Sequence, residues 1–304
     1  MKTIRHVYLS GLGAIGSAFA GKLFDLDPGC LTVLADDERI KRYTRDGVAI
    51  NGKHYPFHYL RPEEESVPAD LILIAVKNHH LSQAIQDIRK FVREDTIILS
   101  LLNGIVSEEI IGREYGLEKL LYSFVVGTDA VRKGTHTRFS NIGKIVFGER
   151  SNSFSPKVAA VKELFDRAQI PYQIPEDMLR ELWWKFMMNV GVNQVSAVLK
   201  APYGVFQKVR EARELMEMAS NEVVVIAARA GINLSAADIE KYIMILDTLA
   251  PEGKTSMLQD VEAGRKTEVE IFAGTIMDLG RRYGVPTPVN EILFRQIRVL
   301  EQAR

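Results

Sequence analysis

The stretch VYLSGLGAIGSAFAG, residues 7–21, decides the fold of the first part of the chain. A short apolar run ends at Gly11, and apolar residues from Ala14 onward recur with the spacing of a helix. A further apolar run, LTVLA at 31–35, begins within about thirty residues of the first run. A strand, a glycine-rich turn, a helix and another strand in this order predict a βαβ unit and a parallel sheet.

The turn between strand and helix has the spacing G-x-G-x-x-G. It comprises Gly11, Leu12, Gly13, Ala14, Ile15 and Gly16. Gly11 permits a tight turn, Gly13 lets a pyrophosphate approach the backbone, and Gly16 lets the helix pack closely on the strand. The N-terminus of the helix contributes amide groups and the positive end of its dipole. With a strand before it and a helix after it, the pattern predicts a dinucleotide-binding site.

Strands and helices continue to alternate through the first half of the chain. Unbroken apolar runs at 69–76 and 95–102 are typical of parallel strands that are covered on both faces. Residues 80–93, which lie between them, have helical periodicity. Asn51-Gly52 stands between two alternating runs and predicts a hairpin. We therefore predict an α/β domain around a parallel sheet.

The second half of the chain has a different character. From Ser155-Pro156, a helix cap followed by proline, the pattern is one of successive helices with a single strand near 171–174. We place the domain boundary at that strand. Residues 1–174 are predicted to form the dinucleotide-binding domain, and residues 175–304 an all-helical domain.

Composition argues against several functional classes. Lys plus Arg and Asp plus Glu number 39 each, a neutral balance that does not favour nucleic-acid binding. No apolar run approaches the roughly 18 residues of a membrane span. The single cysteine, Cys30, excludes an intrachain disulfide and is expected in the core of a cytoplasmic protein. The adjacent His79 and His80 cannot share a helix face, so we expect no metal site.

The residue at the end of the second predicted strand bears on the choice of dinucleotide. Asp36 lies there, where a carboxylate can accept hydrogen bonds from the ribose hydroxyls of NAD(H) and repel a 2′-phosphate. The same carboxylate could instead begin the next helix, whose N-terminus favours acidic residues. Arg39, Lys41 and Arg42 follow closely enough to hold a phosphate, or they form a solvated helix face. The sequence leaves these alternatives open.

Polar residues follow two neighbouring strands of the predicted sheet. Lys77 comes directly after the run at 69–76, and Asn103-Gly104 comes directly after the run at 95–102. Ligands of open parallel sheets bind beyond the carboxyl ends of the strands. Together, the two residues therefore favour a site floor near a nicotinamide over a loop cation and an ordinary turn.

Another polar pattern occurs within WWKFMMNVGVN, residues 183–193. Lys185, Asn189 and Asn193 are spaced four apart, so on an α-helix they share one stripe of an otherwise apolar surface. The stripe faces either water or a polar ligand. A hydride acceptor needs its carbonyl oxygen protonated as hydride arrives at carbon, and a positioned ammonium can do this. Asparagines one and two turns along could hold the substrate, so we favour the ligand.

The segment SMLQDVEAGRKTEVE, which begins at Ser256 and includes Glu268, is by itself typical of a charged helix face. Together with the earlier motifs it resembles the ketopantoate reductases, the 2-dehydropantoate 2-reductase family, over nearly the whole chain. The resemblance is carried by GLGAIG at 11–16, VK at 76–77, NG at 103–104, WWKFMMNVGVN at 183–193 and this late segment. The last two motifs are the most specific.

The resemblance implies a Rossmann-type domain joined to a helical, substrate-binding and catalytic domain, with the active site in the cleft between them. Lys185 would be the general acid that protonates the keto oxygen, and Glu268 would position the substrate hydroxyl or the lysine. Ketopantoate would be bound by Asn189, Asn193 and Ser256. The implied reaction is NADPH-dependent reduction of 2-dehydropantoate to (R)-pantoate, on the route to pantothenate and coenzyme A.

The resemblance also implies cofactor contacts in the first domain. Asn103 would lie near both nicotinamide and substrate, and Lys77 would lie at the mouth of the cleft. Two residues depart from the family pattern. Asp36 stands where many members have an arginine that binds the 2′-phosphate of NADPH, and Tyr203 stands where some offer an asparagine to the substrate. These departures leave NADP(H) and NAD(H) both open as cofactors.

Two other functions are compatible with the same motifs. One is an NAD-dependent D-2-hydroxyacid dehydrogenase on this scaffold, which Asp36 and Tyr203 favour. The other is a dinucleotide-binding regulator without turnover, against which the presence of both Lys185 and Glu268 argues. We expect a small 2-keto acid as the substrate, and the helical domain has enough apolar helices for a homodimer interface.

Overall fold

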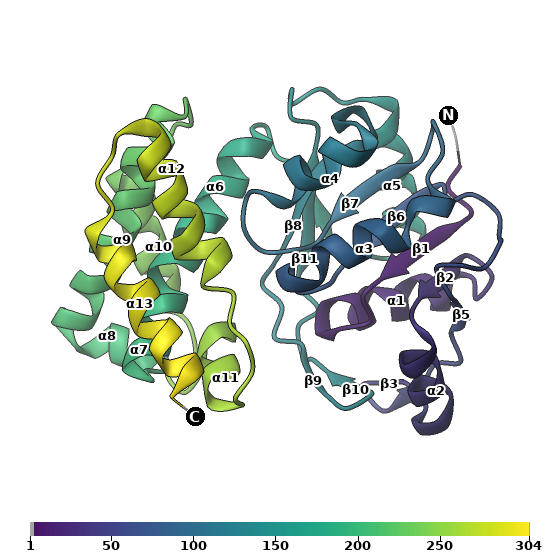
Figure 1. The fold of residues 1–304 in the computed structure, drawn as a ribbon, viewed down its shortest axis with the longest axis horizontal. Helices are drawn as coiled ribbons and strands as arrows, with labels where there is room; N and C mark the ends of the chain where they lie inside the picture. Colours follow the sequence, from purple (N-terminus) through teal and green to yellow (C-terminus); the bar gives the residue numbers. More distant parts are fainter. Residues whose placement is uncertain (1–2, 304) are drawn as a thin grey trace. The chain divides into compact units, whose positions relative to one another are not determined.

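The computed structural model describes residues 3–303, which divide into two compact units. The first unit contains the chain up to Asn103 together with Ser107–Met178. The second contains Gly104–Val106 and the chain from Leu179 onward. Figure 1 shows both units as a ribbon, with labels on those helices and strands that have room for one.

The first unit is built on an eight-stranded sheet with the order β12-β11-β8-β7-β6-β1-β2-β5. Its strands are β1 (Val7–Ser10), β2 (Leu31–Leu34), β5 (His58–Leu60), β6 (Leu71–Ile74), β7 (Ile97–Ser100), β8 (Leu120–Val126), β11 (Lys144–Gly148) and β12 (Tyr172–Gln173). Neighbouring strands pair in parallel except β8 and β11, which are antiparallel. The predicted parallel sheet is confirmed, with β11 and β12 as an edge that runs the other way.

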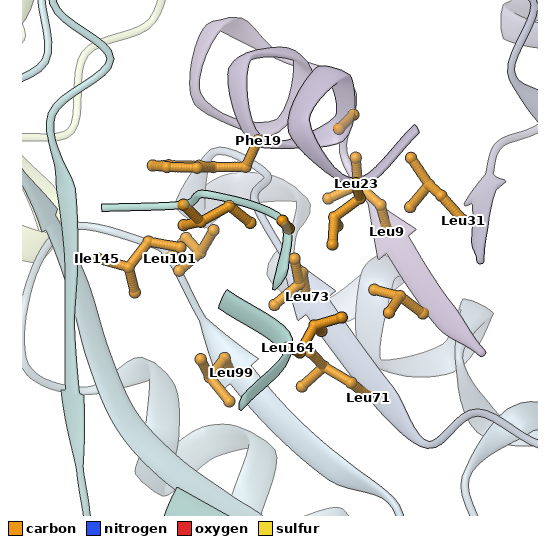
Figure 2. Packing of buried hydrophobic residues seen from close by; sticks show 14 of the residues in the cluster. Leu9, Phe19, Leu23, Leu31, Leu71, Leu73, Leu99, Leu101, Ile145 and Leu164 are labelled. Atoms are coloured by element: carbon orange, nitrogen blue, oxygen red, sulfur yellow. The ribbon is translucent and has the colours of Figure 1, made fainter. Parts of the chain in front are cut away.

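Helices cover both faces of this sheet because its strands are apolar on both sides. Their bounds are α1 (Ala14–Leu26), α2 (Asp37–Asp46), α3 (Leu81–Asp87), α4 (Ser107–Tyr115) and α5 (Pro156–Arg167), with short 3₁₀ turns at η1 (Asn78–His80), η2 (Arg89–Phe91) and η3 (Leu117–Lys119). Side chains alternate along each strand. In β6, Leu71 and Leu73 pack with α1 and α5, whereas Ile72 and Ile74 pack with α3. Figure 2 shows the first of these layers, with Phe19 and Leu23 of α1 near the strand leucines.

A smaller sheet has the order β4-β3-β10-β9. Its strands are β3 (Ala49–Ile50), β4 (Lys53–His54), β9 (Val131–Lys133) and β10 (His136–Arg138). The predicted hairpin joins β3 to β4. Its turn residues, Asn51 and Gly52, have φ of 48° and 84°, the positive values that a two-residue hairpin turn of this type requires. The sequence patterns considered above do not indicate β9 or β10.

The second unit is helical in every regular element of its described part. Its α-helices are α6 (Met178–Met188), α7 (Gln194–Leu199), α8 (Tyr203–Lys208), α9 (Arg210–Arg229), α10 (Ala236–Leu246), α11 (Ser256–Glu262), α12 (Thr275–Tyr283) and α13 (Pro288–Gln302). Two π-helical segments, η4 (Asn189–Asn193) and η5 (Glu270–Gly274), lead directly into α7 and α12. Buried apolar side chains of η4, α7, α8 and α9 pack together, including Val192, Val195, Phe206 and Met216.

Two helices of the second unit have well-defined ends. A capping box of Ser235 and Asp238 begins α10, and Gly284, with φ of 66°, ends α12. Cys30 is buried as expected, and burial raises the pKa of its thiol to about 11. No helix within residues 3–303 combines the length and the apolar character that crossing a bilayer requires.

Candidate active site

The glycine-rich turn joins β1 to α1, and its three glycines differ in how much space surrounds the position of a Cβ atom. Gly11 has φ of 102°, and a Cβ there would lie 2.7 Å from the carbonyl oxygen of Ala75. A Cβ on Gly16 would overlap the carbonyl oxygen of Gly11. At Gly13 the nearest atom would be 3.7 Å away, an ordinary contact. The packing of the protein therefore requires glycine at 11 and 16 but leaves space beside Gly13.

That space adjoins the N-terminus of α1. The amide of Ser17 donates to the carbonyl of Gly13 at 2.9 Å, which is the first turn of the helix. The amides of the residues before Ser17 have no acceptor inside the helix, because helical geometry gives them none. Unpaired amides, the helix dipole and room for a close approach fit the pyrophosphate of a dinucleotide.

Two alanine substitutions separate packing from ligand binding in this turn. Gly16→Ala is expected to destabilise the protein by more than about 2 kcal/mol, because its Cβ would overlap the backbone. Gly13→Ala is expected to change the unfolding free energy by less than about 1 kcal/mol yet weaken dinucleotide binding at least about tenfold. Urea unfolding and a fluorescence titration measure the two effects. Unchanged affinity in Gly13→Ala would place the pyrophosphate elsewhere.

Asp36 at the end of β2 is the N-cap of α2. Its Oδ1 accepts from the amide of Arg39 at 2.8 Å, and Oδ2 lies 3.5 Å from Nε of the same arginine. The helix-start alternative is thus realised. The side chain is nevertheless 56% exposed, and a carboxylate has more acceptor sites than these two contacts use. A contact with a ribose hydroxyl is compatible with the cap.

A basic cluster lies beside α2, and one member was not foreseen. The guanidinium groups of Arg42 and Arg132 each lie over the ring of Tyr43, with Cζ 5.4 Å and 5.5 Å from its centroid. Arg132 comes from β9 and donates from Nη1 to Oγ of Ser17 at 2.9 Å. Burial lowers the pKa of the Arg132 guanidinium. Arg132 is far along the sequence from α1 and α2, so no local pattern predicts that it lies beside them.

Lys77 and Asn103 follow adjacent strands. β6 and β7 pair in parallel, with their last residues, Ile74 and Ser100, side by side. Gly11 follows β1, which pairs with β6 on its other side. The glycine turn, Lys77 and Asn103 therefore follow the carboxyl ends of three consecutive parallel strands, where open sheets bind their ligands.

In the second unit, the stripe of polar residues spans the junction of α6 and η4. Lys185 lies in the last turn of α6, while Asn189 and Asn193 are the first and last residues of η4. The α-helical spacing assumed from the sequence is therefore wrong at the asparagines, since η4 is π-helical. Both asparagines are buried, with 4% and 7% of their surface exposed, so they do not form a water-facing stripe. π-Turns inside helices occur frequently at functional sites.

The Lys185 ammonium is affected by its surroundings. The side chain is half-buried, and burial lowers its pKa to about 8 from an ordinary lysine value near 10.5. Removing an ammonium from water disfavours the charged form, which is the sign observed. A proton held at a pKa close to neutral is easier to give to an oxyanion than one held by an ordinary lysine.

The late motif occupies α11 and the approach to η5. Ser256 is the first residue of α11 and is exposed; Thr255 caps the helix and also donates to Oγ of Ser196 at 3.1 Å. Glu268 is 6% exposed, and its carbonyl accepts from the amides of Ile271 and Phe272. η4 and η5 are in contact. Lys185 lies four residues before η4, and Glu268 lies two residues before η5.

Tyr203, the departure noted in the sequence, lies at the start of α8. Its amide donates to the carbonyl of Gly253 at 2.9 Å, and a Cβ on Gly253 would lie 2.8 Å from the tyrosine ring. The ring thus lies against the loop that leads into α11 and Ser256. Burial raises the pKa of the Tyr203 phenol.

Two sequence models of one family match the chain. The model described as "Ketopantoate reductase PanE/ApbA" matches residues 7–152. The model described as "Ketopantoate reductase PanE/ApbA C terminal" matches residues 177–301. Together they account for most of the chain and include every motif discussed above.

Individual proteins are similar over the full length. The 2-dehydropantoate 2-reductase of Aquifex aeolicus (strain VF5) is 26% identical over 302 residues, which cover 96% of this chain and 95% of that protein. D-mandelate dehydrogenase, solved with NADH and anilino(oxo)acetate, has a TM-score of 0.88 at 21% identity. Dimeric ketopantoate reductase from Staphylococcus aureus has a TM-score of 0.83 at 20% identity. Both comparisons cover 98% of this chain and 99% of the other, and they show a shared fold.

Proposed function

The chain belongs to the ketopantoate reductase family, and from that premise we propose that it reduces 2-dehydropantoate to (R)-pantoate with NADPH. Its class, an oxidoreductase, follows from the family and its relatives. The observation that carries the proposal is Lys185, with its lowered pKa, beside two buried asparagines and a buried glutamate on an adjoining segment. For the assembly we propose a homodimer, which light scattering in solution would test.

We assign the dinucleotide to residues 1–174. When bound, the reduced nicotinamide supplies the hydride. The turn from Gly11 to Gly16 would hold the pyrophosphate at the N-terminus of α1, and Lys77 and Asn103 would flank the nicotinamide end. Asp36 would meet the ribose at the end of β2. The steric freedom at Gly13 supports this placement, because the packing of the protein does not itself explain a glycine there.

We assign the keto acid and the proton transfer to residues 175–304. Lys185 donates a proton to the keto oxygen, which gains negative charge as the carbonyl is reduced. Asn189 and Asn193 orient the substrate by hydrogen bonds, and Ser256 would contact its polar end. Glu268 positions the hydroxyl of the substrate or the ammonium of Lys185. Buried asparagines suit this role because the surrounding packing holds their side-chain amides in fixed positions.

NADPH as the preferred cofactor is supported by local charge. The carboxylate of Asp36 is engaged by the backbone amide and the side chain of Arg39, which limits its repulsion of a phosphate. Arg42 and Arg132 share the ring of Tyr43 and have no ion pair with a carboxylate within residues 3–303. They are the guanidinium groups available to a 2′-phosphate.

A second candidate is NADH-dependent reduction of a different 2-keto acid to a D-2-hydroxy acid. Two observations favour it. Asp36 remains largely exposed at the position that serves the ribose of NAD(H), and Tyr203 places a ring beside the loop that precedes Ser256. An aromatic side chain there would suit a substrate other than ketopantoate.

Initial rates of NADPH and NADH oxidation test these candidates, first with ketopantoate and then with smaller and bulkier 2-keto acids. The proposed function predicts that NADPH with ketopantoate gives the highest kcat/KM, at least about tenfold above any other pair. Preference for NADH and another keto acid would establish the second candidate. Tight dinucleotide binding without turnover of any keto acid would show a regulator instead.

A further inference from the structure

The two π-helical segments of the second unit are connected through one buried side chain. η4 carries Asn189 and Asn193, and η5 begins two residues after Glu268. π-Turns widen the backbone, and side chains commonly insert where regular helical bonding is interrupted. The side chain that does so here is Gln194, the first residue of α7, which is completely buried.

The Gln194 amide makes hydrogen bonds with the backbone of both segments. Its Nε2 donates to the carbonyl of Val190 in η4 at 2.8 Å. Its Oε1 accepts from the amide of Ala273 in η5 at 3.1 Å. A single planar group therefore fixes the distance between the two backbones. No apolar side chain of the same size could make either bond.

Gln194 is itself held by a buried network. Its Nε2 also donates to Oδ1 of Asn290 at 2.9 Å. Asn290 is completely buried, and its Nδ2 donates to Oε2 of Glu222 at 2.7 Å and to the carbonyl of Ala219 at 3.2 Å, both on α9. Glu222 also accepts from the amides of Val289 and Asn290 at the start of α13. Each polar group has a defined partner, so Gln194 has one orientation.

On the face of η4 opposite the site, the backbone packs so tightly on α9 that it has little room to shift. A Cβ on Gly191 would lie 3.2 Å from the carbonyl oxygen of Met216 and would overlap Oγ of Ser220, both on α9. η4 is therefore fixed against α9 on one side and tied to η5 by Gln194. Loss of the Gln194 hydrogen bonds would therefore let η5, and Glu268 with it, shift relative to Lys185.

We propose that Gln194 is a positioning residue that sets the separation between the Lys185–Asn189–Asn193 set and Glu268. The proposal rests on the function proposed above. Gln194 contacts neither substrate nor cofactor in this role; it acts through the backbone of η4 and η5. Misplacement of catalytic groups by about 1 Å can lower rates about a hundredfold.

The test is Gln194→Met, which keeps the length of the side chain and removes its hydrogen bonds. Its matched control is Gln207→Met. Gln207 lies on α8 and also donates from Nε2 to two backbone carbonyls, those of Leu246 and Leu249, at 3.0 Å and 2.9 Å. Gln194→Met should lower kcat about ten- to a hundredfold, whereas Gln207→Met should leave it within about twofold. Retained kcat in Gln194→Met, or an equal loss in both variants, would overturn the proposal.

Gln194→Glu provides a second variant if Gln194→Met does not fold. An ionised carboxylate can accept from Ala273 but cannot donate to Val190, whereas the protonated form can do both. Its kcat relative to wild type should therefore rise as the pH falls and the carboxyl gains its proton. A ratio that does not change with pH would contradict the positioning role.

Amide hydrogen exchange separates failure of this proposal from failure of the proposed function, because it needs no turnover. In Gln194→Met, exchange should accelerate in peptides covering both 189–193 and 270–274, and Gln207→Met should leave both unchanged. If the wild-type protein reduces no keto acid but this exchange pattern appears, the proposed function is wrong and the link between η4 and η5 through Gln194 is supported. If exchange changes in only one segment or in neither, Gln194 does not link the two segments, whatever the enzyme reduces.

Discussion

Replacing Lys185 by alanine is expected to lower kcat about 10²- to 10⁴-fold while the Kd of the dinucleotide changes by less than about twofold. The ammonium acts on charge that develops at the keto oxygen during the reaction, so its loss raises the barrier and leaves cofactor binding unchanged. Steady-state kinetics and a fluorescence titration measure the two quantities. Turnover close to wild type would remove Lys185 from the mechanism.

Lys241→Ala is the matched control for this substitution. The Lys241 ammonium lies 5.3 Å from the ring centroid of Trp184, the residue next to Lys185, but it belongs to α10 and not to the polar stripe. Its removal takes a positive charge from the same neighbourhood. Activity within about twofold of wild type in Lys241→Ala would show that position, and not charge alone, matters.

The lowered pKa of Lys185 predicts how kcat/KM depends on pH and whether the buried charge raises or lowers the stability of the fold. The general acid must be protonated, so kcat/KM should fall as the pH rises through about 8, and this limb should disappear in Lys185→Ala. The unfolded chain binds more protons than the folded one between about pH 8 and 10.5, so burial of the charge costs stability below pH 8. Lys185→Met, inactive by the same argument, should be at least as stable as wild type at pH 7 in urea unfolding.

Replacing Glu268 by glutamine is expected to raise the KM of the keto acid and to lower kcat, with a combined loss of about 10²- to 10³-fold in kcat/KM. Glutamine keeps the size of the side chain but removes the charge that would hold the substrate hydroxyl or the Lys185 ammonium. Initial rates over a range of ketopantoate concentrations separate the two parameters. An unchanged kcat/KM would exclude Glu268 from the site.

Glu270→Gln is the control, since it makes the same chemical change two residues further on. Glu270 is 39% exposed and pairs with Arg298 at 2.9 Å and Lys266 at 3.5 Å. Exposed ion pairs contribute about 0–1 kcal/mol, so the substitution should alter neither stability nor rate appreciably. A loss as large as that of Glu268→Gln would point to a general disturbance of η5.

The parts of the fold that sequence patterns predicted are those with local periodicity. The apolar runs at 69–76 and 95–102 became β6 and β7, the helix predicted from Ala14 onward became α1 (Ala14–Leu26), and Asn51-Gly52 became the turn of the β3–β4 hairpin. Each signal depends on side chains that are close together in the sequence. Some candidate residues of the site were also proposed from local patterns, since Lys77 and Asn103 each follow a strand and Lys185, Asn189 and Asn193 are spaced four apart. The roles of Ser256 and Glu268 came instead from the resemblance to the family.

The features that escaped prediction depend on distant residues. η4 packs tightly on α9 at Gly191 and is joined to η5 through Gln194, and neither contact has a sequence signature. Arg132 meets Ser17 only because β9 lies in the smaller sheet beside α1. Periodicity predicts which face of an element is apolar, but it does not predict which long-range polar contacts fix the geometry of that face.

The cap at the start of α2 limits how relatives of this protein could change their cofactor during evolution. Asp36 closes the first turn of the helix, and in the proposed cofactor site its carboxylate would also repel a 2′-phosphate. An immediate change to arginine would remove the cap at a cost of about 0.5–2 kcal/mol. Asparagine or serine would keep the cap and discard the charge, because both cap helices about as well as aspartate. The route to stronger phosphate binding that preserves stability therefore passes first through a neutral cap residue at position 36. A direct change to arginine would be tolerated only in a protein stable enough to lose the free energy of the cap.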